Sequence, residues 1–125
     1  MKNKDYFTQE LKTLINIYVN SIHDIYGSHL RNVILYGSYA RGDYNDYSDI
    51  DIMILVDLND MDIKKYRHQL SDITFDINID NDIDIKPMAV NAQHFDKWVG
   101  TYPFYSNVME EGVMLYEAAW RCWEY

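Results

Sequence analysis

The spacing of apolar residues alternates between helical and extended along the chain, and this predicts an α/β fold. In residues 6–26 apolar side chains recur every three or four positions, which predicts an amphipathic helix that stops at Gly27. Two runs rich in Val, Ile and Leu, residues 31–36 and 49–56, are typical of buried strands. A second apolar stripe predicts a helix that is capped by Asn59 or Asp60 and fades over residues 78–82.

The second half of the chain carries weaker signals, which still complete a small domain. The expected elements are a strand over 83–86 ended by Pro87, a helix from Asn91 to residue 98, a helix from Pro103 to Gly112, an edge strand over 113–116 and an aromatic tail over 117–125. The fold class expected from this order is α/β (α+β), a small mixed sheet with helices packed on one face. Residues 1–125 are expected to form a single domain.

Composition narrows the class of protein. The net charge of −9 argues against a general nucleic-acid binder, which needs a basic surface for phosphate contacts. No apolar run reaches the roughly 18 residues of a membrane span, and no signal peptide is visible at the start. The lone cysteine, Cys122, excludes an internal disulfide and fits a reducing cytoplasm. We therefore expect a cytoplasmic protein without membrane contact.

Two carboxylates interrupt the second apolar run, close to a small-residue pair that follows the first. Asp49 and Asp51 are two positions apart on a strand, so they share a face, with Cα atoms roughly 6.6 Å apart. A charge inside such a run is unfavourable unless it is paired or bound to a metal. Gly37 lets a backbone approach phosphate, and Ser38 offers an N–H and a hydroxyl. This pattern favours a site for phosphate and Mg²⁺.

A third carboxylate would complete a two-metal site for nucleotidyl transfer. Mg²⁺ prefers oxygen ligands, and two such ions can flank a reacting phosphate. Asp84 alternates with flanking isoleucines and is the expected third metal ligand and general base, with Asp82, of the same parity, as the alternative. Arg41 is either a phosphate contact or a structural partner of Asp43 or Asp46. The predicted catalytic and metal-binding residues are thus Asp49, Asp51 and Asp84, and those predicted to bind nucleotide are Gly37, Ser38 and Arg41.

The sequence G-S-Y-A-R-G over residues 37–42, followed by S-D-I-D-I over 48–52, resembles a known signature. It is similar to that of the minimal nucleotidyltransferase domain of the DNA polymerase β superfamily, antitoxin type, whose pattern it matches at every fixed position. The segment around Asp84 resembles the strand that supplies the family's third aspartate. The resemblance covers about residues 10–117 and implies a polymerase-β-like nucleotidyltransferase fold.

The resemblance also implies an activity and a partner. Such a protein would move AMP from ATP, with Mg²⁺, to a hydroxyl, in many members a tyrosine of a HEPN-type toxin that forms a toxin–antitoxin pair. A small-molecule nucleotidyltransferase and a non-enzymatic nucleotide-binding module stay open as alternatives. Because no second substrate domain is visible, the acceptor is expected from a partner or a second copy of the chain. The aromatic residues of the final quarter, including Trp120, Trp123 and Tyr125, are expected to form either such an interface or packing against the sheet and the first helix.

Overall fold

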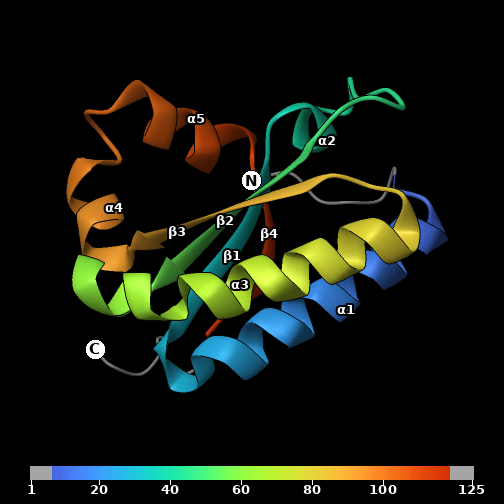
Figure 1. Cartoon of the computed structure of the whole chain (residues 1–125). Helices are drawn as coiled ribbons and strands as arrows, with labels where there is room; N and C mark the ends of the chain where they lie inside the picture. Colours follow the sequence, from blue (N-terminus) through green and yellow to red (C-terminus); the bar gives the residue numbers. More distant parts are fainter. Residues whose placement is uncertain (1–6, 119–125) are drawn as a thin grey trace.

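A mixed sheet with the strand order β3-β2-β1-β4 forms the centre of the molecule (Figure 1). The computed structural model describes residues 7–118. β1 pairs antiparallel with both β2 and β4, and β2 pairs in parallel with β3. In chain order the elements are α1 (Gln9–Tyr26), the 3₁₀ turn η1 (Gly27–His29), β1 (Leu30–Tyr36), α2 (Ser38–Arg41), β2 (Ile50–Val56), α3 (Asp60–Asn81), β3 (Ile85–Asn91), α4 (Ala92–Trp98), α5 (Pro103–Glu111) and β4 (Val113–Glu117).

The two long helices cover one face of the sheet, and their apolar stripes form the larger core. α1 and α3 lie side by side across this face (Figure 1), where the Tyr18 hydroxyl lies 2.7 Å from the Thr74 hydroxyl. Both polar groups are buried and satisfied, because Thr74 also donates to the Leu70 carbonyl. The predicted mixed sheet with its helix-covered face is therefore confirmed. The opposite face carries in addition α4 and α5, which bury Phe95 and Val108 against the strands.

Most predicted helix boundaries are confirmed by their caps. Asn59 and Asn91 accept hydrogen bonds from the backbone N–H groups of Asp62 and His94, so they begin α3 and α4 as N-caps. Gly27 follows α1 with a φ of 57°, a conformation that suits glycine. α3 is longer than predicted: it continues through residues 78–81 and ends at Asp82, which adopts the left-handed conformation.

The predicted third strand was misplaced. Pro87 does not end it: β3 begins at Ile85, runs through Pro87 and reaches Asn91. A proline is tolerated here because β3 is an edge strand, where every second N–H points away from the ladder. Ile85, which has the same parity as Pro87, directs its N–H away from β2 to the Asn78 side chain at 2.8 Å. Asn78 also donates to the Ile85 carbonyl at 3.2 Å, so a side chain of α3 satisfies the outer edge where β3 begins.

Replacing Asn78 by alanine is expected to lower the free energy of unfolding by about 2 kcal/mol, since the change leaves a part-buried donor and acceptor of Ile85 unpaired. Asn81→Ala is the matched control, because Asn81 is exposed and bonds only within its own helix, to the Ile77 carbonyl. Urea denaturation should show a change below about 0.5 kcal/mol for this control. Equal effects of the two substitutions would contradict the role given to Asn78.

Two further sequence-based expectations concern membrane contact and the aromatic C-terminal tail. No helix within residues 7–118 combines the length and apolar character needed to cross a bilayer. Of the predicted aromatic tail, Glu117 is the last residue of β4 and Ala118 is buried. Cys122 and the aromatic residues Trp120, Trp123 and Tyr125 lie outside the described residues.

Candidate active site

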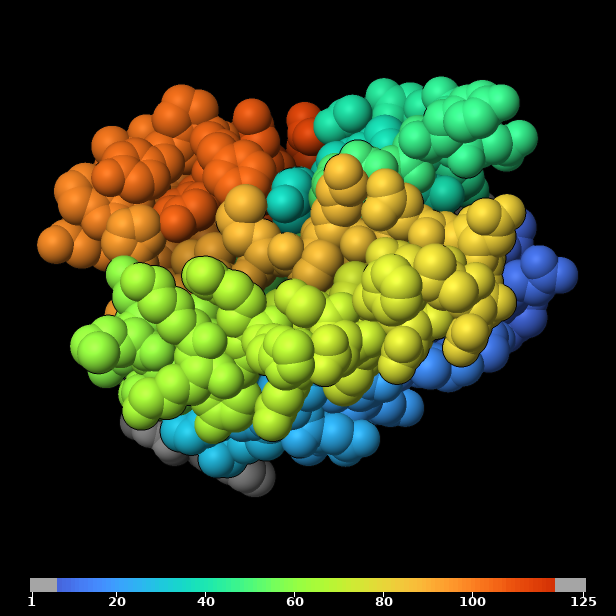
Figure 2. All heavy atoms as spheres, viewed as in Figure 1, coloured from blue at the N-terminus to red at the C-terminus, as the bar shows by residue number. Residues whose placement is uncertain are grey.

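The predicted site residues meet at one end of the sheet because of its topology. β2 is antiparallel to β1 and parallel to β3, so the end of β1 lies beside the starts of β2 and β3. Gly37 follows β1, Asp49 directly precedes β2 and Asp84 directly precedes β3. The backbone N–H of Ile50 donates to the Asp84 carbonyl at 2.9 Å, which holds the two strand starts together. In Figure 2 the start of β3, ochre, lies between the orange α4 and α5 and the green loop before β2.

Gly37 and Asp51 are in direct contact. Gly37 adopts a φ of 75°, and a Cβ placed on it would collide with the Asp51 carboxylate. Asp51 pairs with Tyr36 across the ladder and therefore lies on the same face as the Tyr36 side chain. The sharp turn after β1 thus brings a bare backbone against the carboxylate, which no residue with a side chain could do without displacing it.

Negative charge accumulates around Asp51. Burial raises the pKa of Asp51, and the nearby carboxylates of Asp49 and Asp84 raise it further, whereas Lys86 and Arg41 act in the opposite direction. The Lys86 ammonium lies 3.5 Å from Asp49 Oδ2 and 3.9 Å from Asp84 Oδ2. The three predicted carboxylates are therefore electrostatic neighbours, and a cation lies between two of them.

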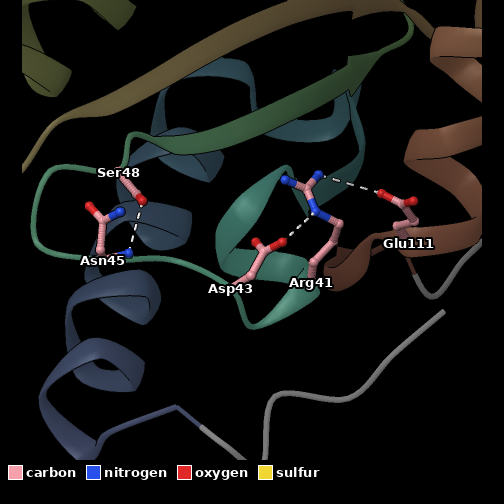
Figure 3. A network of polar contacts seen from close by, with 5 residues as sticks. All are labelled: Arg41, Asp43, Asn45, Ser48 and Glu111. Carbon is pink, nitrogen blue, oxygen red and sulfur yellow. Dashed lines mark hydrogen bonds and ion pairs between the residues drawn. The ribbon is translucent and has the colours of Figure 1, made fainter.

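Arg41, predicted as a nucleotide contact or a structural partner, forms two ion pairs in this structure (Figure 3). Its Nε lies 3.3 Å from Asp43 Oδ2, and a terminal nitrogen lies 3.6 Å from Glu111 Oε2. The pair with Asp43 was one of the predicted alternatives, whereas Asp46 is not the observed partner. Because Glu111 ends α5, the guanidinium links the turn after β1 to the helix layer on the second face.

The loop before β2 is held by its own side chains, as Figure 3 shows for Asn45 and Ser48. The Ser48 hydroxyl accepts from the Asn45 N–H at 2.9 Å, and the Ser48 N–H donates back to the Asn45 carbonyl at 3.1 Å. The Asn45 side chain in turn accepts from the N–H of Tyr47 at 2.8 Å. Ser48 is thus a local hydrogen-bonding residue that positions the loop.

Two hollows open beside this cluster. The smaller one, about 160 Å³, lies between Gly37, Arg41 and the α5 side chains Phe104 and Asn107. Its Tyr36 wall packs edge-to-face against Phe104, with ring centroids 5.6 Å apart. The larger one, about 620 Å³, is lined by Tyr39, Asp46, Tyr47, Ser48, Asp82, Ile83 and Asp84. Both candidates for the third carboxylate line this cavity, but of the two, Asp84 is the one that shares the Lys86 ammonium with Asp49.

The donor set suits a hard divalent cation. Within residues 7–118 no three carboxylate, histidine or cysteine side chains are already gathered closely enough to hold a metal. Like charges separate without a counter-ion, and here Asp49 and Asp84 are drawn toward an ammonium group. Two of their oxygens therefore already lie beside a positive charge, and carboxylate oxygens are ligands that Mg²⁺ prefers. We conclude that the residues present fit such a metal.

Two contributors to the site escaped the sequence analysis. Lys86 lies two residues after Asp84, so strand alternation could have placed both side chains on one face. Both residues also lie within the strand predicted over 83–86, but the sequence analysis assigned Lys86 no part in the site. Glu111 is 70 positions beyond Arg41, and no periodic signal in the sequence links the two residues.

Comparisons with known proteins identify relatives of this chain. The family model described as "Polymerase beta, Nucleotidyltransferase" matches residues 20–119. A protein of Methanocaldococcus jannaschii, named as a candidate protein adenylyltransferase, is 34% identical over 102 residues, which are 82% of this chain and 94% of the relative. A second M. jannaschii protein of the same description is 37% identical over 79 residues, 63% of this chain and 78% of the relative.

Solved structures share the fold. A chain of a toxin–antitoxin complex crystallised with AMP-PNP aligns with a TM-score of 0.55 and 20% identity, covering 86% of this chain and 76% of that one. A chain of the complex between a tri-AMPylated Shewanella oneidensis HEPN toxin and its MNT antitoxin aligns with a TM-score of 0.51 and 18% identity, covering 92% and 77%. At these identities the likeness shows the fold, and it confirms the predicted polymerase-β-like architecture.

Proposed function

This chain belongs to the polymerase beta nucleotidyltransferase family, and from that premise we propose that it transfers AMP from ATP to a hydroxyl group of a partner protein. The observation that most supports the proposal is the contact between Gly37 and Asp51, with Asp49 and Asp84 at the same end of the sheet. A backbone segment without a side chain, next to several carboxylates, suits the binding of a triphosphate that is complexed with divalent cations.

In this proposal the nucleotide phosphates lie along the turn after β1. The Gly37 backbone permits close approach, and Ser38 offers its N–H and hydroxyl at the start of α2. Asp49, Asp51 and Asp84 would hold two Mg²⁺ ions, whose chemistry is to neutralise charge on the triphosphate and on the attacking oxygen. Arg41 stays a candidate phosphate contact, and would have to exchange one of its present carboxylate partners for the nucleotide.

The chemical step is a substitution at the α-phosphorus. The acceptor oxygen forms a bond to this phosphorus while the bond to the oxygen that leads to the β-phosphate breaks, and pyrophosphate leaves. The hydroxyl proton passes to the Asp84 carboxylate, which acts as general base. The products are an adenylylated acceptor and pyrophosphate, and the fixed positions of Gly37 and the carboxylates contribute the alignment that in-line displacement requires.

We further propose that the acceptor is a tyrosine of a HEPN-type toxin, which would make this chain the antitoxin of the pair. The support is the description of the M. jannaschii relatives as candidate protein adenylyltransferases, together with the fold shared with toxin–antitoxin complexes. Phe104 of α5 is exposed and lines the smaller hollow beside the site, and Tyr102, directly before α5, is exposed as well. Exposed aromatic side chains of this kind suit the docking of a partner protein.

The proposed reaction can be tested with ATP that carries an isotope label on either its α- or its γ-phosphate. We expect the α-phosphate label of ATP, but not the γ-phosphate label, to appear on a HEPN-type protein when Mg²⁺ is present. A tyrosine-to-phenylalanine series in that protein would identify the acceptor. Parallel assays with GTP, CTP and UTP would establish the base preference. Absence of label transfer and of pyrophosphate release with every nucleotide would contradict the proposed function.

A matched pair of substitutions tests the third carboxylate. Asp84→Asn is expected to slow transfer by about a hundredfold or more, because it removes the general base, while ATP affinity stays within a few-fold of its original value. Asp82→Asn should change neither quantity, since asparagine tolerates the left-handed conformation that Asp82 adopts. Label transfer and calorimetric ATP binding measure the two effects. The reverse pattern would identify Asp82 as the third carboxylate.

A further inference from the structure

Lys86 forms ion pairs with two of the three carboxylates of the site. It lies on β3, two residues after Asp84, and pairs with Asp51 across the parallel ladder, so its side chain projects on the face that carries the site. Its ammonium lies 3.5 Å from Asp49 Oδ2 and 3.9 Å from Asp84 Oδ2. These distances are those of ion pairs, and they place one positive charge where two carboxylates from neighbouring strands converge.

The charge of the surroundings explains why a cation is needed there. Three carboxylates gather at one end of the sheet in a chain of net charge −9. The carboxylates of Asp49 and Asp84 are close enough to Asp51 to repel its negative charge. The neighbouring guanidinium of Arg41 is engaged by Asp43 and Glu111. Lys86 is therefore the group that compensates Asp49 and Asp84 directly before any metal arrives.

We infer that Lys86 is a tethered cation, which holds the carboxylate cluster together in the nucleotide-free protein and competes with the first metal ion that enters. This inference rests on the proposed function, because it assigns the same carboxylates to metal binding. An ammonium group and a divalent ion repel each other, so they cannot both lie between Asp49 and Asp84. Binding of the metal thus requires the lysine to move.

The structure allows the Lys86 side chain to move without a change in the backbone. The Lys86 side chain is 58% exposed, and its flexible four-carbon stem can swing into solvent while the backbone stays in place. The backbone of β3 is fixed independently by its ladder with β2 and by the hydrogen bonds between Asn78 and Ile85. Lys86 is consequently a positioning residue: it keeps the carboxylates assembled and raises the metal concentration at which they become occupied.

Substitution of Lys86 by methionine, which keeps the length of the stem and removes the charge, tests the inference. Lys64→Met is the matched control, because Lys64 is exposed near the start of α3, which follows the far end of β2. Lys86→Arg retains the charge. The measurements use the full chain without nucleotide: the melting temperature in EDTA, and the dissociation constant of Mn²⁺ from electron paramagnetic resonance.

We expect Lys86→Met to bind Mn²⁺ roughly three- to tenfold more tightly than the unchanged protein and to melt about 1–3 °C lower in EDTA. Lys64→Met should match the unchanged protein in both measurements, and Lys86→Arg should restore the melting temperature. If the protein without substitutions binds Mn²⁺ and Lys86→Met binds it equally or more weakly, the inference about Lys86 is overturned, whereas the proposed function is not. Absence of Mn²⁺ binding in every variant would instead contradict the proposed metal site and function.

Discussion

An Asp51→Asn variant is expected to transfer nucleotide about a thousandfold or more slowly than the unchanged protein, without loss of the fold. The asparagine keeps the shape of the side chain against Gly37 but removes the charge that the proposed metal site requires. The shift in melting temperature that Mg²⁺ and ATP should produce in the unchanged protein is expected to disappear for the same reason. Label transfer and thermal melts with and without Mg²⁺ and ATP measure both effects.

The same variant is expected to be slightly more stable without metal. The pKa of Asp51 is raised in the folded state, chiefly by burial, so the folded protein holds this proton more tightly than the unfolded chain. The stabilisation by the protonated carboxyl is present at acid pH and is lost as the pH rises through the folded-state pKa. At neutral pH the ionised group opposes folding, and its removal should raise the melting temperature by about 1–3 °C.

Asp57→Asn serves as the control for this prediction. Asp57 is exposed directly after the other end of β2, so Asp57→Asn makes the same chemical change away from the site. It should retain transfer activity and the response to Mg²⁺ and ATP. A full thermal shift by Mg²⁺ and ATP in Asp51→Asn would show that Asp51 does not take part in binding metal and nucleotide.

A Gly37→Ala variant is expected to lose both stability and activity. The added methyl group would collide with the Asp51 carboxylate, and alanine resists a φ of 75°. Together these effects should lower the free energy of unfolding by about 2–4 kcal/mol and slow transfer by about a hundredfold or more, since Asp51 is displaced. Urea denaturation and the label-transfer assay measure the two effects.

Two other glycines separate the causes of that loss. Gly27 also has a positive φ, 57°, but a Cβ there would have open space, so Gly27→Ala should show only the backbone effect, about 1–2 kcal/mol, and full activity. Gly100 has open space without the unusual φ, and Gly100→Ala should be close to neutral. If Gly37→Ala were no more disruptive than Gly27→Ala, the contact with Asp51 would be unimportant.

Local sequence patterns predicted β1 and β2, the two strands that position Gly37, Asp49 and Asp51. The apolar runs of β1 and β2 are nearly continuous, and the position of Asp49 and Asp51 in the second run is visible without a structure. Strand alternation then placed both side chains on one face.

Features that depend on tertiary context could not be predicted in the same way. Pro87 ends a strand by local rules, yet it lies inside β3 because an edge strand has free positions on its outer side. The pair between Arg41 and Glu111 depends on how α5 packs on the second face of the sheet. The position of Lys86 between two carboxylates depends on the parallel pairing of β2 and β3, which single-sequence patterns do not specify.

The outer edge of β3 also bears on how the protein behaves at high concentration. An open strand edge is a template on which a second chain can extend the sheet, and this is a common start of aggregation. Here the first outward-facing amide, that of Ile85, is occupied by Asn78, and the next outward position is Pro87, which has no N–H to offer. A strand of another chain would therefore find two consecutive hydrogen-bond donors missing on the outer edge of β3. This edge can consequently stay exposed beside the site without pairing with other chains into fibrils.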